Sequence, residues 1–342
     1  MSDFLGLLAA PFMGCLLIAA LHCYMGLHVV RRGVIFVDLA LAQLAALGAT
    51  VALLVVPLVF GEPVSEHHHE QAEFQSSLAV AAGQTGDAST QAGAPPSDPG
   101  EKTGVSGTRA WLLDRVPYAM SLLFTIIGAA LFALTRFRHG DVPHEAIIGI
   151  VYVVSAALAV LVLSKAPHGH EQMEAMLVGS ILFVSWKDVL ATFLLYLPLA
   201  ILHFAVRRRL LLISDNVRSA EAAGVHVRAW DFLFYVTFGL MVTQSVKMAG
   251  VLVVFSYLII PAVCASMLVK GFASRLILSW GLALLASVIG LMFSAAKDMP
   301  TGPALVAVFG AILVITAIAR PLVARVRRAS PRLAEAQEAV ER

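Results

Sequence analysis

One carboxylate stands out because it lies inside an otherwise apolar segment. Residues 34–60 contain Asp38 and the amide Gln43 but no other ionisable side chain. A lone carboxylate in hydrocarbon costs about 2.5–3.5 kcal/mol on insertion scales, so it normally faces a cavity or a partner. Oxygen ligands suit hard divalent cations, and zinc also accepts nitrogen. Asp38 is therefore a candidate ligand on a cation path, or else a partner of nearby Arg31 and Arg32.

Two histidines and one further acid are weaker candidates. His22 lies in the middle of the first apolar segment, and His203 lies near the inner end of the fifth. Each fits either a ligand or a packed histidine whose hydrogen bonds are satisfied. Glu145 opens the segment EAIIGI. It could belong to the same path, or it could interact with the positive end of a helix dipole.

A third group of possible ligands lies in a polar segment. The sequence SEHHHE places His67, His68 and His69 between two glutamates. Neutral imidazoles bind zinc and similar ions, so a mobile cluster could collect metal outside a membrane. The spacing is not that of a closed structural site, and an inert solvated loop explains it equally well.

The composition indicates a membrane protein. Hydrophobic residues make up 59% of the chain and charged residues 13%, against about 25% for a soluble domain. An α-helix needs about 20 apolar residues to cross the hydrocarbon core. Nine segments suit spanning helices, at residues 4–30, 34–60, 116–136, 145–164, 188–206, 230–248, 249–268, 275–296 and 302–319. We therefore expect an all-α, polytopic bundle.

The positions of the basic residues predict its orientation. Lys and Arg accumulate in cytoplasmic loops. Most of the 24 Lys and Arg fall on one side of the predicted topology, including the run at 207–209 and the tail at 321–342. We expect the N-terminus outside and the C-terminus in the cytoplasm of a bacterial inner membrane.

Two interruptions divide the predicted membrane domain, which comprises residues 1–60 and 114–320. Residues 61–113 are rich in Gly, Ser, Thr, Pro and Ala, so we expect a disordered external loop that holds the three histidines. Residues 165–187 contain only a short apolar stretch and predict a half-helix near the outer surface. Irregular backbone at that depth must be buried or line a watery cavity, so this segment is a candidate wall of the entrance.

A short helix is expected between the fifth and sixth spans. Ser214 or Asp215 can cap its start, alanines favour its interior, and Gly224 suits the left-handed position after its end. On the residues alone, it is either an amphipathic connector or a surface offered to a motor subunit.

Seven stretches together resemble the ABC-3 family of metal-importing permeases. In order they are PFMGCLLIAAL (11–21), VVRRGVIFVDLALAQLAALG (29–48), EAIIGIVYVV (145–154), MLVGSILFVSWKDVL (176–190), DNVRSAEAAGV (215–225), AGVLVVFSYLIIPAVCASML (249–268) and DMPTGPALV (298–306). The resemblance implies that residues 215–225 form the coupling helix, with Asp215, Arg218, Glu221 and Gly224 at the contact with an ATP-binding cassette subunit. It also implies a homodimer, an extracytoplasmic metal-binding protein, and a divalent ion as cargo rather than a permanent cofactor.

The second span departs from the family pattern. The family typically has an Asp and a His four residues apart, in a pattern like GDALSH. Ungapped matching places Leu39 at the Asp position and Gln43 at the His position, while Asp38 falls one residue early. One residue rotates a side chain by about 100° around a helix. We therefore expect a rearranged metal path or a different selectivity.

Three function classes follow. The first is the permease subunit of an ATP-driven importer of zinc, manganese or iron. The chain has no GxxxxGK[ST] phosphate loop, so ATP hydrolysis is expected on a separate subunit. The second is a secondary transporter driven by an ion gradient, which would need more intramembrane acids or histidines. The third is an intramembrane enzyme, but the chain contains no HExxH or GxSxG motif. No block of interleaved basic and aromatic residues points to nucleic-acid binding.

Overall fold

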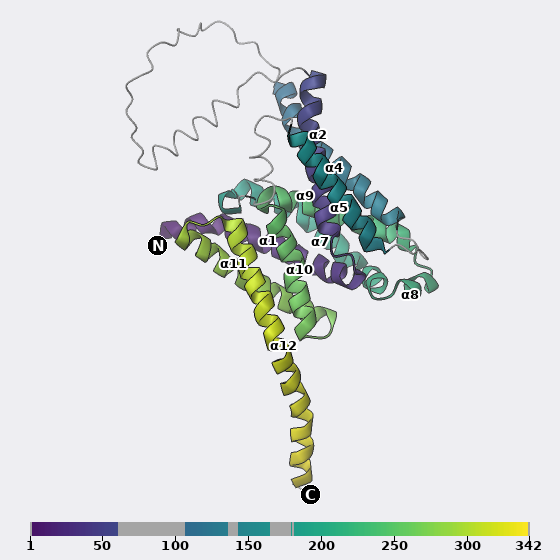
Figure 1. Cartoon of the computed structure of the whole chain (residues 1–342), viewed down its shortest axis with the longest axis vertical. Helices are drawn as coiled ribbons and strands as arrows, with labels where there is room; N and C mark the ends of the chain where they lie inside the picture. The colour runs from purple at the N-terminus through teal and green to yellow at the C-terminus, as the bar shows by residue number, and fades with distance from the viewer. Residues whose placement is uncertain (1, 61–106, 136–142, 165–178, 180, 341–342) are drawn as a thin grey trace.

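The computed structural model describes residues 2–60, 107–135, 143–164, 179 and 181–340 (Figure 1). Within these ranges the chain forms helices and no strand. The helices are α1 (Ser2–Arg32), α2 (Val37–Phe60), α4 (Gly107–Leu134), α5 (His144–Leu163), α7 (Trp186–Asp215), α8 (Val217–Ala222), α9 (Val227–Ala249), α10 (Val251–Leu268), α11 (Phe272–Lys297) and α12 (Thr301–Val340), with a 3-10 turn η1 (Ile181–Phe183) before α7.

The predicted class, a polytopic helical bundle, is confirmed. Eight helices are long and apolar enough to cross a membrane: α1, α4, α5, α7, α9, α10, α11 and the first part of α12. The remaining expected span is α2, whose stretch Val37–Ala52 is a shorter apolar helix within the range searched. The chain turns between α9 and α10 at Gly250, whose φ of 80° favours glycine.

Several boundaries differ from the predicted ones. Helix α7 continues to Asp215, past the expected end at 206, because its basic side chains lie on neighbouring rings. The Arg207 guanidinium lies 3.9 Å from the Phe204 ring centroid. Helix α4 begins at Gly107, inside the loop expected to run to 113. The histidine cluster and most of the expected outer half-helix lie outside the described residues, and η1 is the described end of that half-helix.

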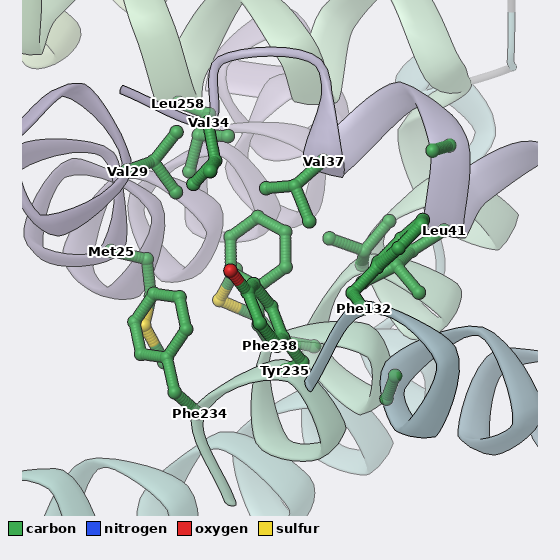
Figure 2. Packing of buried hydrophobic residues seen from close by; sticks show 14 of the residues in the cluster. Met25, Val29, Val34, Val37, Leu41, Phe132, Phe234, Tyr235, Phe238 and Leu258 are labelled. Carbon is green, nitrogen blue, oxygen red and sulfur yellow. The ribbon is translucent and has the colours of Figure 1, made fainter. Parts of the chain in front are cut away.

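The helices pack in two neighbouring groups. Helix α2 packs on both α4 and α5, and α4 also packs on α9. Helices α10, α11 and α12 form the second group, and α1 packs on α10, α11 and α7 (Figure 1). The largest core joins α1, α2, α4, α9 and α10 through residues such as Met25, Leu41, Phe132, Phe238 and Leu258 (Figure 2).

Glycines allow the closest helix contacts. A Cβ on Gly26 of α1 would lie 1.9 Å from the backbone oxygen of Leu258 in α10. A Cβ on Gly48 of α2 would lie 2.4 Å from the backbone oxygen of Met120 in α4. Small residues let backbones approach in membrane bundles, where packing between helices is a main source of association.

Candidate functional site

The candidate site begins with His22 on α1, which is fully buried and lies near side chains of α7 and α9. Its Nδ1 lies 3.0 Å from the Ile18 carbonyl, which can only accept, so this nitrogen donates. Its Nε2 lies 3.1 Å from Ser245 Oγ and is left to accept the serine proton. The imidazole is then neutral, the form that binds metals.

Ser245 has other acceptors for its proton. Its Oγ lies 2.9 Å from the Met241 carbonyl and 3.0 Å from the Val242 carbonyl. The hydroxyl can therefore turn away from His22 Nε2 while keeping a hydrogen bond. This arrangement makes the Nε2 lone pair available to a cation at little cost, although the resting histidine is satisfied.

Asp38 is the second member of the site. Its side chain is buried, with 1% exposure, and its Oδ1 has no hydrogen-bond partner within the described ranges. It lies within electrostatic range of Tyr196 on α7, whose ring centroid is 6.2 Å from that of His22. Arg31 and Arg32, the alternative partners named from sequence, pair with other acids. Of the predicted path residues, Asp38 and His22 therefore both lie near Tyr196.

Glu145 has a structural contact at the start of α2. Its Oε1 accepts the backbone N–H of Phe36 at 3.0 Å, so it caps a neighbouring helix rather than its own. Its Oε2 is buried without a hydrogen-bond partner among the residues described. Gln43 is half-buried, one and a half turns after Asp38 on α2. Within the part of the chain that the structure describes, no three His, Cys, Asp or Glu side chains form a metal cluster.

The short helix α8 connects the ends of α7 and α9. Its N-cap is Asn216, whose side chain accepts the Ser219 N–H at 3.2 Å, so the cap lies one residue later than expected because Ser214 and Asp215 still belong to α7. At its C-terminal end, Gly224 has a φ of 75° and donates to the Glu221 carbonyl, as expected for this glycine. The N–H of Val225 bonds to the Ala220 carbonyl, which completes a Schellman motif.

A small apolar cluster anchors α8 and leaves polar side chains of the helix outward. Ala220 is fully buried against Ile213 and Val227, at the ends of the flanking spans. Arg218 and Gly224 are exposed, and Glu221 is half-buried. Asp215 is exposed and pairs with Arg31, with 2.5 Å between NH1 and Oδ1. The helix therefore presents a fixed polar surface beyond the end of the bundle.

Sequence reasoning missed a polar network behind α8. Arg32 donates from Nε to Ser214 Oγ at 3.0 Å and from NH1 to Asp231 Oδ1 at 2.7 Å. Ser214 Oγ also lies 2.9 Å from His28 Nδ1, to which it can donate. His203, considered above as a ligand, lies beside this network with its Nε2 2.8 Å from Thr237 Oγ1. The available signal was the pair of arginines that ends α1, but nothing in their spacing identifies partners so distant in the chain.

Known transport proteins are similar to this chain. It is 25% identical over 213 residues to the manganese transport system membrane protein MntC of Listeria innocua, covering 60% of this chain and 75% of that protein. It is 29% identical over 204 residues to a probable metal transport system membrane protein of Treponema pallidum, covering 57% and 73%. The chelated iron transport system membrane protein YfeC of Yersinia pestis is 25% identical over 191 residues, covering 56% and 64%.

Solved structures share the fold. PsaBC from Streptococcus pneumoniae, in complex with Fab, superposes with a TM-score of 0.62 at 17% identity, covering 92% of this chain and 93% of that one. An inward-facing putative metal-chelate type ABC transporter gives a TM-score of 0.57, also at 17% identity. A profile of the ABC 3 transport family matches residues 103–320, more than half of the sequence. The chain, with its bundle of spanning helices and its α8, therefore belongs to the ABC 3 transport family.

Proposed function

We propose that this protein is the membrane permease subunit of an ATP-driven importer of divalent metal ions. The observation that carries the proposal is α8, a capped helix with an outward polar face that joins two spans inside the region matched by the family. Similar proteins named for manganese, iron or unspecified metal transport support metal as the cargo. Family membership fits a transport subunit whose ATP hydrolysis takes place on a partner.

Asp38 and His22 are the proposed cargo ligands in the middle of the membrane. The carboxylate offers an unpartnered oxygen, and the imidazole offers a nitrogen that Ser245 can release. Gln43 and Glu145 are proposed to lie along the same path. Two strong donors are fewer than the four to six that zinc or manganese prefers. A second copy of the chain, facing the first across the path, would supply the rest, which supports a homodimer.

The partners are proposed to bind at opposite ends of the bundle. An ATP-binding cassette subunit would hold α8 through Asp215, Arg218, Glu221 and Gly224. A soluble metal-binding protein would dock near η1 at the outer end, where His67, His68 and His69 would collect ions loosely. We propose with it that the N-terminus lies outside and the C-terminus lies in the cytoplasm of a bacterial inner membrane.

The test is transport by the purified permease reconstituted in liposomes with its ATP-binding cassette subunit. ATP hydrolysis and uptake of zinc, manganese and iron are measured in the same vesicles. We expect one or more of these ions to raise the hydrolysis rate and to accumulate only when ATP is present. Uptake driven by an ion gradient without ATP would instead establish the secondary transporter considered above and overturn the proposal.

A further inference from the structure

A buried ion pair lies behind the short helix α8 and joins it to a different part of the bundle. The partners are Arg32, at the end of α1, and Asp231, in the second turn of α9. Their side chains are both 1% exposed, although they lie at the end of the bundle where α8 emerges. The Arg32 guanidinium also lies 3.9 Å from the Phe234 ring centroid. This arginine is thus held on one face by charge and on another by an aromatic ring.

The same arginine reaches both sides of α8. Its Nε donates to Ser214, two residues before the Asn216 cap, and its NH1 donates to Asp231, shortly after α9 begins. His28, one turn earlier on α1, also contacts Ser214. The loop that carries α8 therefore enters and leaves the bundle through residues held by α1. Helix α8 is therefore held by contacts from α1 as well as by α7 and α9, the two helices that it joins.

Breaking the buried ion pair between Arg32 and Asp231 is unfavourable. Two charges excluded from water attract strongly, and separating them leaves each buried without compensation. The planar guanidinium donates along two directions at once, so it fixes an angle as well as a distance. When α8 is displaced, it will therefore carry the end of α1 with it rather than slide past that end.

Helix α1 extends from these contacts of Arg32 to the proposed cargo site. His22 precedes Arg32 on the same continuous helix, about 15 Å away along its axis at 1.5 Å per residue. No proline interrupts the helix between these residues, since its one proline is Pro11. A tilt or shift applied at Arg32 therefore reaches the His22 imidazole as a rigid-body movement.

We propose that Arg32 is a positioning residue that, through Asp231 and Ser214, fixes α8 to α1 and so passes its displacement to the His22 side of the cargo site. This inference rests on the proposed function of the chain as a permease driven through α8. It adds the route by which the drive enters the bundle: through the first helix as well as through the two helices that α8 connects.

The test replaces the buried pair by apolar side chains of similar size, Arg32→Met with Asp231→Leu. Such exchanges are often neutral for stability when both charges are removed together. The variant permease is assembled with its ATP-binding cassette subunit in liposomes, and metal taken up per ATP hydrolysed is measured. We expect the complex to assemble and hydrolyse ATP while this ratio falls about tenfold, within the range common for coupling between sites.

A matched control is Arg207→Met. It removes an arginine near the same end of the bundle that lies on the exposed Phe204 ring. We expect its ratio of metal to ATP to stay within about twofold of the unmodified complex, as for surface substitutions generally. A folded double variant with an unchanged ratio would overturn the proposal, because a merely structural pair would leave the ratio alone.

Two further measurements keep the outcomes separate. If the double variant does not assemble, Arg32→Lys decides, because lysine keeps the charge but loses the two-directional contact. A normal ratio for Arg32→Lys also contradicts the inference. The unmodified complex is measured in parallel. If it does not couple ATP to metal uptake, the proposed function fails. If it does and the variants match it, only the role of Arg32 fails.

Discussion

At the scale of single residues, the side chains of interest differ in whether their polar atoms are satisfied. His22 has partners for both ring nitrogens, and one of those partners can turn away. Asp38 is buried with an oxygen that has no hydrogen-bond partner in the described ranges. A buried carboxylate with an unpartnered oxygen is a candidate for binding a ligand that arrives during function.

Replacing Asp38 by Asn tests this explanation. The amide keeps the size of the side chain but removes the charge that a divalent ion needs. Loss of an outer ligand already costs about 10–100-fold in metal affinity or activity, so we expect metal-stimulated ATPase activity to fall at least about tenfold. The melting temperature in detergent should stay equal or rise, because no buried charge remains to be desolvated. Full metal stimulation in this variant would remove Asp38 from the path.

Gly26 supports a prediction about packing. Gly26→Ala would place a methyl group against the backbone of Leu258, where no side chain can move aside. Overpacking of this kind costs about 1–3 kcal/mol, so we expect a lower melting temperature in detergent. Gly281→Ala is the matched control, since its new methyl group would meet nothing within 4 Å. Equal melting temperatures for the two variants would contradict a close approach of α1 and α10 at Gly26.

The sequence identifies residues that are unusual where they stand, but not the partners that the fold gives them. Asp38 is conspicuous as the one acid of an apolar segment. In the sequence, Arg32 and Asp231 look like ordinary charges near the ends of predicted spans, because 199 residues separate them. Glu145 lies in the first turn of its own helix, as the sequence predicts, but its carboxylate accepts the Phe36 N–H of another helix. Short-range patterns cannot contain such contacts.

At the scale of elements, local chemistry determines where α8 begins and ends. Gly224 takes the left-handed conformation that its position predicts, and the cap differs by one residue because α7 is longer than its apolar run. Helix α7 exceeds its expected length because arginines are good helix formers and their long side chains lie on aromatic rings. The end of an apolar run therefore marks the membrane boundary better than it marks the end of a helix.

Removing the cap of α8 should loosen it without disturbing the spans. In Asn216→Ala the Ser219 N–H loses its acceptor, which typically costs about 1 kcal/mol. We expect faster amide hydrogen exchange across Val217–Ala222 and weaker copurification of the ATP-binding cassette subunit. Asn216→Asp, which caps equally well, is the control and should restore both. Unchanged exchange in Asn216→Ala would show that the apolar packing of α8 holds the helix without this cap.

At the scale of the whole molecule, contacts sort the helix ends into two sets that agree with the predicted topology. Arg31 and Arg32 meet Ser214, Asp215 and Asp231 at one end. At the other, the Lys247 ammonium lies 5.7 Å from the Tyr118 ring centroid, and α1 packs against η1. In these contacts of the described residues, each helix end thus meets a partner expected on the same side of the membrane.

Labelling of single introduced cysteines decides the orientation, and the chain is well suited to it. All three native cysteines are buried, namely Cys15, Cys23 and Cys264, so an impermeant maleimide should not label the unmodified protein. Arg218→Cys, on the exposed face of α8, should react in inside-out vesicles and not in intact cells. Phe183→Cys, at a side chain that is 78% exposed in η1, should show the reverse. Since α7 separates the two sites, one spanning helix requires opposite results. Labelling of Arg218→Cys from outside would mean that the bundle has the opposite orientation in the membrane. Helix α8 would then lie outside the cell, away from ATP, and the basis for an ATP-driven permease would be removed.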